Sequence, residues 1–201
     1  MRKKLLSLIF LSLTACNDSP KNLAKLSDDA VILAFGDSLT YGTGASKFKD
    51  YPNILAELTS LEVINEGVPG EISSEGLKRL PALLDEYQPK LLILIHGGND
   101  ILRKIPPEQT ADNLNRMIEE AANRHINVVM LGVPQPSLWT LTSADFYQRI
   151  AEDRNVPVDL NTLPGILGDN GLKSDMIHPN DAGYRLMAGN IFKLLQEAGA
   201  L

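Results

Sequence analysis

Short runs of apolar residues alternate along the chain with longer segments whose apolar positions recur every three or four residues. The runs are apolar almost throughout, which is the pattern of strands covered on both faces of a parallel sheet. We expect strands at residues 31–35, 61–64, 91–95, 126–131 and 156–158. The segments between them predict helices at 51–59, 71–87, 107–124, 144–154 and 181–198. This alternation predicts an α/β domain, a three-layer α/β/α sandwich with about five parallel strands.

Two of the predicted helices carry a clear apolar stripe. In segment 107–124 the stripe consists of Leu114, Met117, Ile118 and Ala121. In segment 181–198 it consists of Tyr184, Met187, Ala188, Ile191, Leu194 and Leu195. Pro81 falls inside segment 71–87, where its missing N–H and its ring disfavour a continuous helix, so we expect a break there.

The first fifteen residues have the pattern of an export signal. Arg2, Lys3 and Lys4 precede an apolar stretch at 5–13, which is too short to span a bilayer as a helix. The sequence Leu13-Thr14-Ala15-Cys16 then resembles the cleavage box of bacterial lipoproteins. We expect residues 1–15 to be removed, Cys16 to carry lipid, residues 16–29 to form a polar tether and residues 30–201 to form the domain. An ordinary secretory signal is the alternative.

Charge and cysteine usage restrict the partners of this domain. The chain has 201 residues, enough for one domain with a sizeable core. Its only cysteine is Cys16, so the domain contains no disulfide and no cysteine-ligated metal. Loss of the three basic signal residues changes the formal charge from −6 to −9. An acidic domain without a basic cluster argues against nucleic-acid binding, and we expect membrane attachment only through lipid on Cys16.

Four polar motifs follow predicted strands or precede the last helix. They are Gly36-Asp37-Ser38-Leu39, Asn65-Glu66-Gly67-Val68-Pro69-Gly70, Gly97-Gly98-Asn99-Asp100 and Asp175-Met176-Ile177-His178-Pro179-Asn180. The first motif alone is more typical of an ordinary turn. However, the first three follow successive strands, and the carboxyl ends of parallel strands meet at the edge where open α/β sheets bind ligands.

A serine nucleophile needs a base, and the chain has three histidines. His125 ends an amphipathic helix and is interpreted as solvated surface. His96 ends a strand, where we favour a structural role over a place in the site. His178 follows Asp175 by three residues on a turn-rich loop, a spacing that allows the carboxylate to orient the ring. We therefore expect His178 to be the base.

In this order, the four motifs resemble the signature blocks of the SGNH (GDSL) hydrolase family, especially its bacterial thioesterases, lysophospholipases and arylesterases. The resemblance implies a flavodoxin-like fold and a triad of Ser38, Asp175 and His178. It also implies an oxyanion hole formed by Ser38, Gly70 and Asn99. Gly67 is the competing glycine. Asp37 and Asp100 are interpreted as carboxylates that stabilise turns.

The resemblance implies a serine hydrolase that acts on acyl esters of lysophospholipid, acyl-thioester or aryl-ester type. The signal pattern adds that the enzyme is exported and anchored to the cell envelope, facing the periplasm or the cell exterior. We expect no cofactor and no metal. Two alternatives stay open: a carbohydrate O-deacetylase of the same family, and a non-catalytic binding lipoprotein. We expect loops 40–49 and 134–141, which include Tyr41 and Trp139, to line the acyl pocket. Leu138, Trp139 and Leu141 could form an apolar wall there, with packing in the core as the alternative.

Overall fold

The computed structural model describes residues 23–136 and 141–201. Its central sheet has five parallel strands in the order β2-β1-β3-β4-β7. The strands are β1 (Val31–Gly36), β2 (Glu62–Gly67), β3 (Leu91–Ile95), β4 (Asn127–Leu131) and β7 (Val158–Asp159). This order is the flavodoxin-like one, in which the direction of winding reverses between β1 and β3. The predicted fold class is confirmed.

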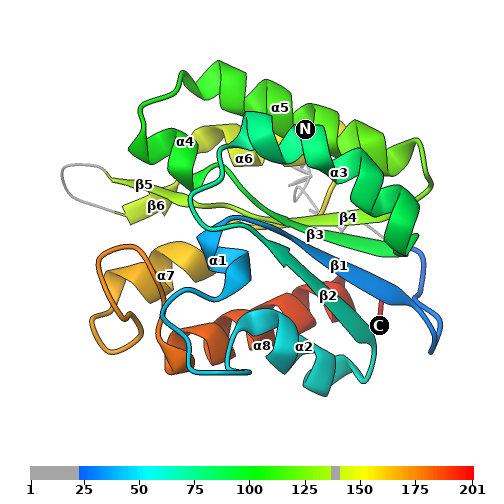
Figure 1. Ribbon diagram of the computed structural model, residues 1–201, viewed down its shortest axis with the longest axis horizontal. Helices are drawn as coiled ribbons and strands as arrows, with labels where there is room; N and C mark the ends of the chain where they lie inside the picture. Colours follow the sequence, from blue (N-terminus) through cyan, green and yellow to red (C-terminus); the bar gives the residue numbers. More distant parts are fainter. Residues whose placement is uncertain (1–22, 137–140) are drawn as a thin grey trace, which may run out of the picture.

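Helices cover both faces of the sheet (Figure 1). One layer contains α3 (Ser73–Tyr87), α4 (Gly98–Leu102), α5 (Pro107–Ala122) and α6 (Asp145–Arg154). The other contains α1 (Ser38–Tyr41), α2 (Tyr51–Thr59), α7 (Thr162–Gly168) and α8 (Asp181–Glu197). A small antiparallel pair, β5 (Pro134–Pro136) and β6 (Leu141–Ser143), lies beside the main sheet.

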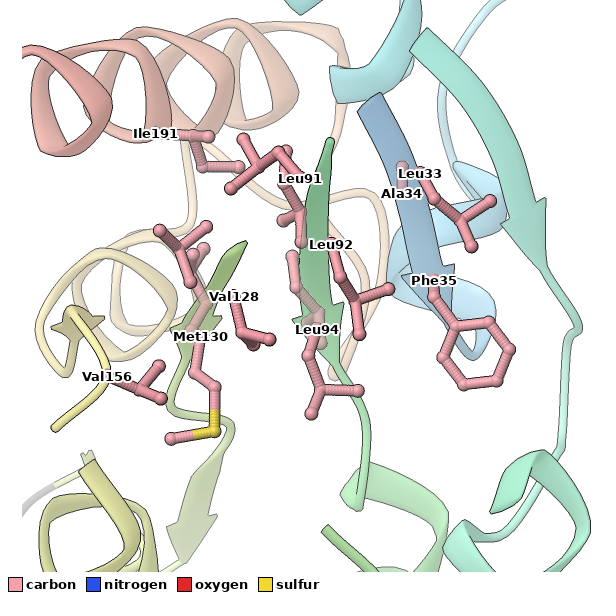
Figure 2. Packing of buried hydrophobic residues seen from close by; sticks show 14 of the residues in the cluster. Leu33, Ala34, Phe35, Leu91, Leu92, Leu94, Val128, Met130, Val156 and Ile191 are labelled. Atoms are coloured by element: carbon pink, nitrogen blue, oxygen red, sulfur yellow. The ribbon is translucent and has the colours of Figure 1, made fainter. Parts of the chain in front are cut away.

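The core forms where the central strands meet the amphipathic helices. Every residue of β3 is buried, as are all four residues of the predicted α5 stripe. Figure 2 shows part of this core, with Leu33 on β1, Leu92 on β3, Val128 on β4 and Ile191 on α8. Burial of each large aliphatic side chain contributes roughly 1.5–3 kcal/mol. Strand β2 differs from the prediction of a fully covered strand, because it is the edge strand and its residues are only partly buried or exposed.

The predicted break at Pro81 is wrong, because α3 continues through it as one helix. Leu80 and Leu84 are both fully buried next to this proline, and α3 packs along α5. A proline in a helix interior costs about 3 kcal/mol. We attribute the continuity of α3 to packing of its apolar face, which offsets that cost.

The ordered domain begins before residue 30. The backbone N–H of Leu23 donates to the Ala198 carbonyl at 2.7 Å, and that of Leu26 donates to the Ala200 carbonyl at 2.8 Å. Leu26 is also buried, so the last part of the predicted tether packs against the C-terminal end. The predicted signal peptide and Cys16 lie outside the described residues. No helix in the described part of the chain is long and apolar enough to cross a membrane.

The strand register brings the loops of the candidate site to one edge. Gly36 at the end of β1 is in register with Gly67 of β2 and with Ile95 of β3. The segments that leave these strands therefore start side by side. In Figure 1, α1, α4 and the loop after α7 lie together at this end of the sheet, on the left.

Candidate active site

Ser38 is the first residue of α1, directly after the turn that ends β1. The Asp37 side chain caps this short helix by accepting a hydrogen bond from the Leu39 N–H at 3.1 Å. Asp37 thus stabilises the turn, as the sequence predicts. Burial raises the pKa of the Asp37 carboxyl, and the nearby imidazoles of His96 and His178 oppose that rise. Because Ser38 starts the helix, its N–H is one of those that an α-helix leaves without an internal acceptor.

The loop before α8 is organised by Asp175. One carboxylate oxygen, Oδ1, accepts hydrogen bonds from the N–H groups of Ile177 at 2.8 Å and His178 at 2.9 Å. The other, Oδ2, lies 2.7 Å from Nδ1 of His178. The Ser174 N–H donates to the His178 carbonyl at 2.9 Å and closes the turn. The single carboxylate therefore shapes the loop and orients the histidine ring.

His178 connects this loop to Ser38. Its Nε2 atom lies 3.0 Å from Ser38 Oγ, across 140 positions of sequence. Burial would raise the pKa of Asp175, but the hydrogen bonds from the His178 ring and the Ile177 N–H outweigh it and hold the pKa below its ordinary value. Asp175 is therefore ionised at neutral pH and favours a proton on His178 Nδ1. This leaves Nε2 as the acceptor for the serine proton, which is the geometry of a nucleophile–base–carboxylate triad.

Gly70 and Asn99 lie in the same pocket wall as Ser38 and His178. Gly70 has a φ of 81°, a backbone conformation that favours glycine. The competing residue, Gly67, does not line this pocket, and its N–H donates to Asn65 Oδ1 at 3.0 Å. Gly70 rather than Gly67 therefore lines the pocket that contains Ser38.

The Asn99 amide is held by two acceptors. Its Nδ2 donates to the Glu71 carbonyl at 3.0 Å and makes a longer contact of 3.3 Å with Asp37 Oδ2. Asn99 lies on α4, the short helix that follows β3. Its amide nitrogen, rather than its oxygen, is thus held next to the turn that carries Ser38.

These groups border a pocket of about 330 Å³, within the range of small-ligand sites. Its wall is largely apolar and includes Leu39, Ile101, Leu102, Val133, Leu141, Leu167, Met176 and Ile177. Of the two loops predicted to line it, one contributes Thr43 and the other Pro134 and Leu141. Tyr41 instead is 57 % exposed and does not line the pocket, whereas Leu138 and Trp139 lie outside the described residues.

Sequence reasoning missed most of the apolar part of the pocket wall. Leu102 and Leu167 come from α4 and α7, two short helices that the apolar periodicity does not reveal. Met176 and Ile177 lie between Asp175 and His178, so their position inside the motif was the signal that could have found them.

The remaining candidate residues have other contacts. His125 is exposed, as predicted. His96 is fully buried, does not line the pocket and contacts Glu71, which agrees with the favoured structural role. Asp100 accepts hydrogen bonds from the Ser73 N–H and hydroxyl and so fastens the start of α3 to α4. Within 23–136 and 141–201, no group of three or more His, Cys, Asp or Glu side chains is placed to hold a metal ion.

The sequence model of the GDSL-like Lipase/Acylhydrolase family matches residues 34–186. The chain belongs to this family. The GDSL motif is the segment around Ser38, and the matched range includes all the residues of the candidate triad. The predicted SGNH (GDSL) membership is confirmed.

Individual relatives of this GDSL hydrolase match most of its length. It is 31 % identical over 185 residues to an arylesterase of Vibrio mimicus, covering 84 % of this chain and 88 % of the relative. It is 29 % identical over 176 residues to thioesterase 1/protease 1/lysophospholipase L1 of Escherichia coli (strain K12), covering 82 % and 83 %. The crystal structure of TesA superposes with a TM-score of 0.76 at 27 % identity, covering 84 % of this chain and 99 % of that one.

Proposed function

We propose that this GDSL hydrolase is a serine esterase or thioesterase that works through an acyl-enzyme. The observation that carries the proposal is the 3.0 Å contact between Ser38 Oγ and His178 Nε2 in the wall of an apolar pocket. A serine hydroxyl becomes a useful nucleophile only when a base accepts its proton, and the base needs an orienting partner. Asp175, 2.7 Å from His178 Nδ1, supplies that partner.

In the first half of the proposed reaction, Ser38 Oγ attacks the acyl carbonyl carbon while His178 Nε2 accepts the hydroxyl proton. The carbonyl oxygen becomes an oxyanion as the new C–O bond forms. His178 then donates its proton to the leaving alcohol or thiol, and the acyl group stays on Ser38. In the second half, a water molecule attacks the acyl carbonyl carbon while His178 accepts its proton. The bond between Ser38 Oγ and the acyl carbon then breaks, His178 returns the proton to Oγ, and the carboxylic acid leaves.

The oxyanion requires donors that are already in place. We assign the backbone N–H groups of Ser38 and Gly70 and the Asn99 amide to this role. One Asn99 Nδ2 proton is held by the Glu71 carbonyl at 3.0 Å. The contact of Nδ2 with Asp37 Oδ2 is longer, at 3.3 Å, so we assign the second Nδ2 proton to the oxyanion.

The pocket wall supports an acyl chain or an aromatic ring as the group next to the scissile bond. Apolar residues from six separate segments of the described chain line it, and an apolar ligand part gains free energy in proportion to the surface that it buries there. The names of the relatives point the same way, since one is an arylesterase and another a thioesterase and lysophospholipase. An acetylated sugar would leave much of this wall without an apolar partner.

The experiment that tests the proposal compares the wild type with Ser38→Ala. Hydrolysis should be measured on p-nitrophenyl esters of increasing length, a lysophospholipid, an acyl thioester and an acetylated sugar, and a fluorophosphonate probe should label Ser38 alone. We expect hydrolysis of the first three classes by the wild type and none by Ser38→Ala. Activity confined to the acetylated sugar would identify a deacetylase, and a folded wild type that neither labels nor turns over would identify a binding lipoprotein.

We also propose that the protein is exported and anchored to the cell envelope by lipid on Cys16. The basic residues, the apolar stretch and the Leu13-Thr14-Ala15-Cys16 box support this proposal. Mass spectrometry of the native N-terminus should find a lipidated Cys16, and Cys16→Ser should block lipid attachment. An unmodified N-terminus after a different cleavage site would instead indicate an ordinary secretory signal.

A further inference from the structure

Glu71 connects the two proposed oxyanion donors that do not belong to the serine itself. It follows Gly70 directly in the sequence, and its carbonyl accepts the hydrogen bond from Asn99 Nδ2 at 3.0 Å. Any shift of the Glu71 backbone therefore moves the Gly70 N–H and changes the support of the Asn99 amide at the same time.

The Glu71 carboxylate is fixed by two basic side chains. Arg79 donates from Nε to Oε1 at 2.7 Å and from Nη2 to Oε2 at 2.9 Å. His96 Nε2 lies 3.0 Å from Oε2. Burial would raise the pKa of Glu71, but the hydrogen bonds from His96 and Arg79 outweigh it and lower that pKa. The two-point arginine contact fixes the orientation of the carboxylate as well as its position.

The second ring nitrogen of His96, Nδ1, shows which atom donates in the hydrogen bond between His96 and Glu71. The Gly97 N–H donates to His96 Nδ1 at 3.0 Å, so the ring proton lies on Nε2 and points to Glu71. The Tyr147 hydroxyl donates to the His96 carbonyl at 2.6 Å and holds the strand end. Asn99 follows three residues later, so His96 links the Glu71 loop to the segment that carries the amide.

Gly76 makes room for this contact. A Cβ atom there would lie 2.5 Å from His96 Nε2 and 3.1 Å from Glu71 Oε2. Glycine is disfavoured inside a helix relative to alanine, and Gly76 is inside α3. The sequence thus departs from helix propensity at a position where a Cβ atom would clash with His96 Nε2.

We propose that Glu71, held by Arg79 and His96, is a positioning residue that sets the oxyanion donors Gly70 and Asn99. This inference rests on the proposed serine-hydrolase function. The donors act on charge that develops only in the transition state, so their misplacement lowers kcat rather than substrate binding. A displacement of about 1 Å from productive geometry can cost about 10²-fold in rate.

The test compares Glu71→Gln with Glu66→Gln. Glu66 is the other carboxylate partner of Arg79, at 3.4 Å. Its replacement removes this ion pair from Arg79 without changing the loop after Gly70. We expect Glu71→Gln to lower kcat about 10- to 100-fold with little change in KM, and Glu66→Gln to keep the wild-type kcat. Turnover should be expressed per site titrated with a fluorophosphonate, and melting temperatures should be recorded for both variants.

A transition-state mimic separates positioning from a purely structural role. An alkylboronic acid forms a tetrahedral adduct with the serine and places an oxygen in the oxyanion hole. Its inhibition constant should rise with the loss of kcat in Glu71→Gln, while that of the carboxylic acid product stays near the wild-type value. Equal weakening of both inhibitors would overturn the proposal.

A second pair of variants decides the matter if Glu71→Gln does not fold. His96→Gln keeps an N–H donor at a similar reach, whereas His96→Leu fills the space without one. We expect His96→Gln to retain most of the turnover and His96→Leu to lose about as much as Glu71→Gln. Wild-type kcat in folded Glu71→Gln or His96→Leu would overturn the positioning role alone. Turnover in Ser38→Ala would instead overturn the proposed function, and this inference with it.

Discussion

The molecule contains two histidine–carboxylate pairs with opposite surroundings. In the first, His178 Nδ1 contacts Asp175 at 2.7 Å, and the Asp175 side chain is 53 % exposed. In the second, His96 Nε2 contacts Glu71 at 3.0 Å, and both side chains are buried, with 0 % and 6 % exposure. The same two chemical groups therefore meet once on a surface loop and once inside the protein.

The difference lies in the second ring nitrogen. In His178 this nitrogen faces the Ser38 hydroxyl in the wall of the pocket. In His96 it accepts the Gly97 N–H, so both nitrogens are already engaged by the fold. A base needs a free nitrogen within reach of a substrate or nucleophile. Only the His178 pair meets that requirement, and the His96 pair can act only by holding other groups in place.

The largest expected effect separates the two pairs directly. His178→Ala removes the base, so we expect kcat to fall on the order of 10³–10⁶-fold while the melting temperature changes little. The double variant with Ser38→Ala should lose hardly more, because triad members act as a unit. Steady-state kinetics and a thermal melt on the same preparations check both points. Near-normal turnover in His178→Ala would reverse the assignment of the two histidines.

The next effect concerns Asn99, which donates to the Glu71 carbonyl and lines the same pocket as His178. Asn99→Ala should lower kcat by roughly 10²–10³-fold, about 3–4 kcal/mol, with little change in KM, because the oxyanion exists only in the transition state. Asn99→Asp should be at least as harmful, since a carboxylate has no proton to donate. A variant that melts earlier but turns over normally per folded molecule would make Asn99 a purely structural residue.

For the free energy of unfolding we expect the opposite order, with a larger loss from replacing His96 than from replacing His178. His96→Leu leaves the Gly97 N–H without its acceptor and removes one donor to the buried Glu71 carboxylate. We expect a loss of about 2–3 kcal/mol in the free energy of unfolding. For His178→Leu we expect less than about 1 kcal/mol, because its partner Asp175 is half-exposed and water can replace the lost hydrogen bond. Urea denaturation measures both values, and equal losses would contradict the comparison.

The smallest expected effect is on acid stability. The pKa of Glu71 lies below its ordinary value in the folded protein, so the unfolded chain binds the proton more readily. This contribution to stability is complete above the ordinary glutamate value of about 4.3 and is lost as the pH falls through the lower, folded value. Glu71→Gln should therefore flatten the pH dependence of the free energy of unfolding below about pH 5. Asp175→Asn, with a half-exposed side chain, should flatten it less.

The order of the elements could be predicted because it depends on local patterns. All five main-sheet strands and five of the longer helices lie where the apolar runs and stripes predict them, with ends shifted by a few residues. Short elements such as α4 and α7 are too brief to show a periodicity. Pro81 shows the opposite error, since a local preference against helix was outweighed by packing of Leu80 and Leu84.

The sequence by itself determined which strand ends carry Ser38 and Asn99 and that Asp175 could reach His178, because these relations follow from strand order and a three-residue spacing. Only the tertiary structure decided that Glu71 pairs with Arg79 and with His96, 25 residues away in the sequence. The physical reason is that these contacts depend on how closely α3 approaches the end of β3. That distance is set by the packing of whole helices on the sheet and by the missing side chain of Gly76.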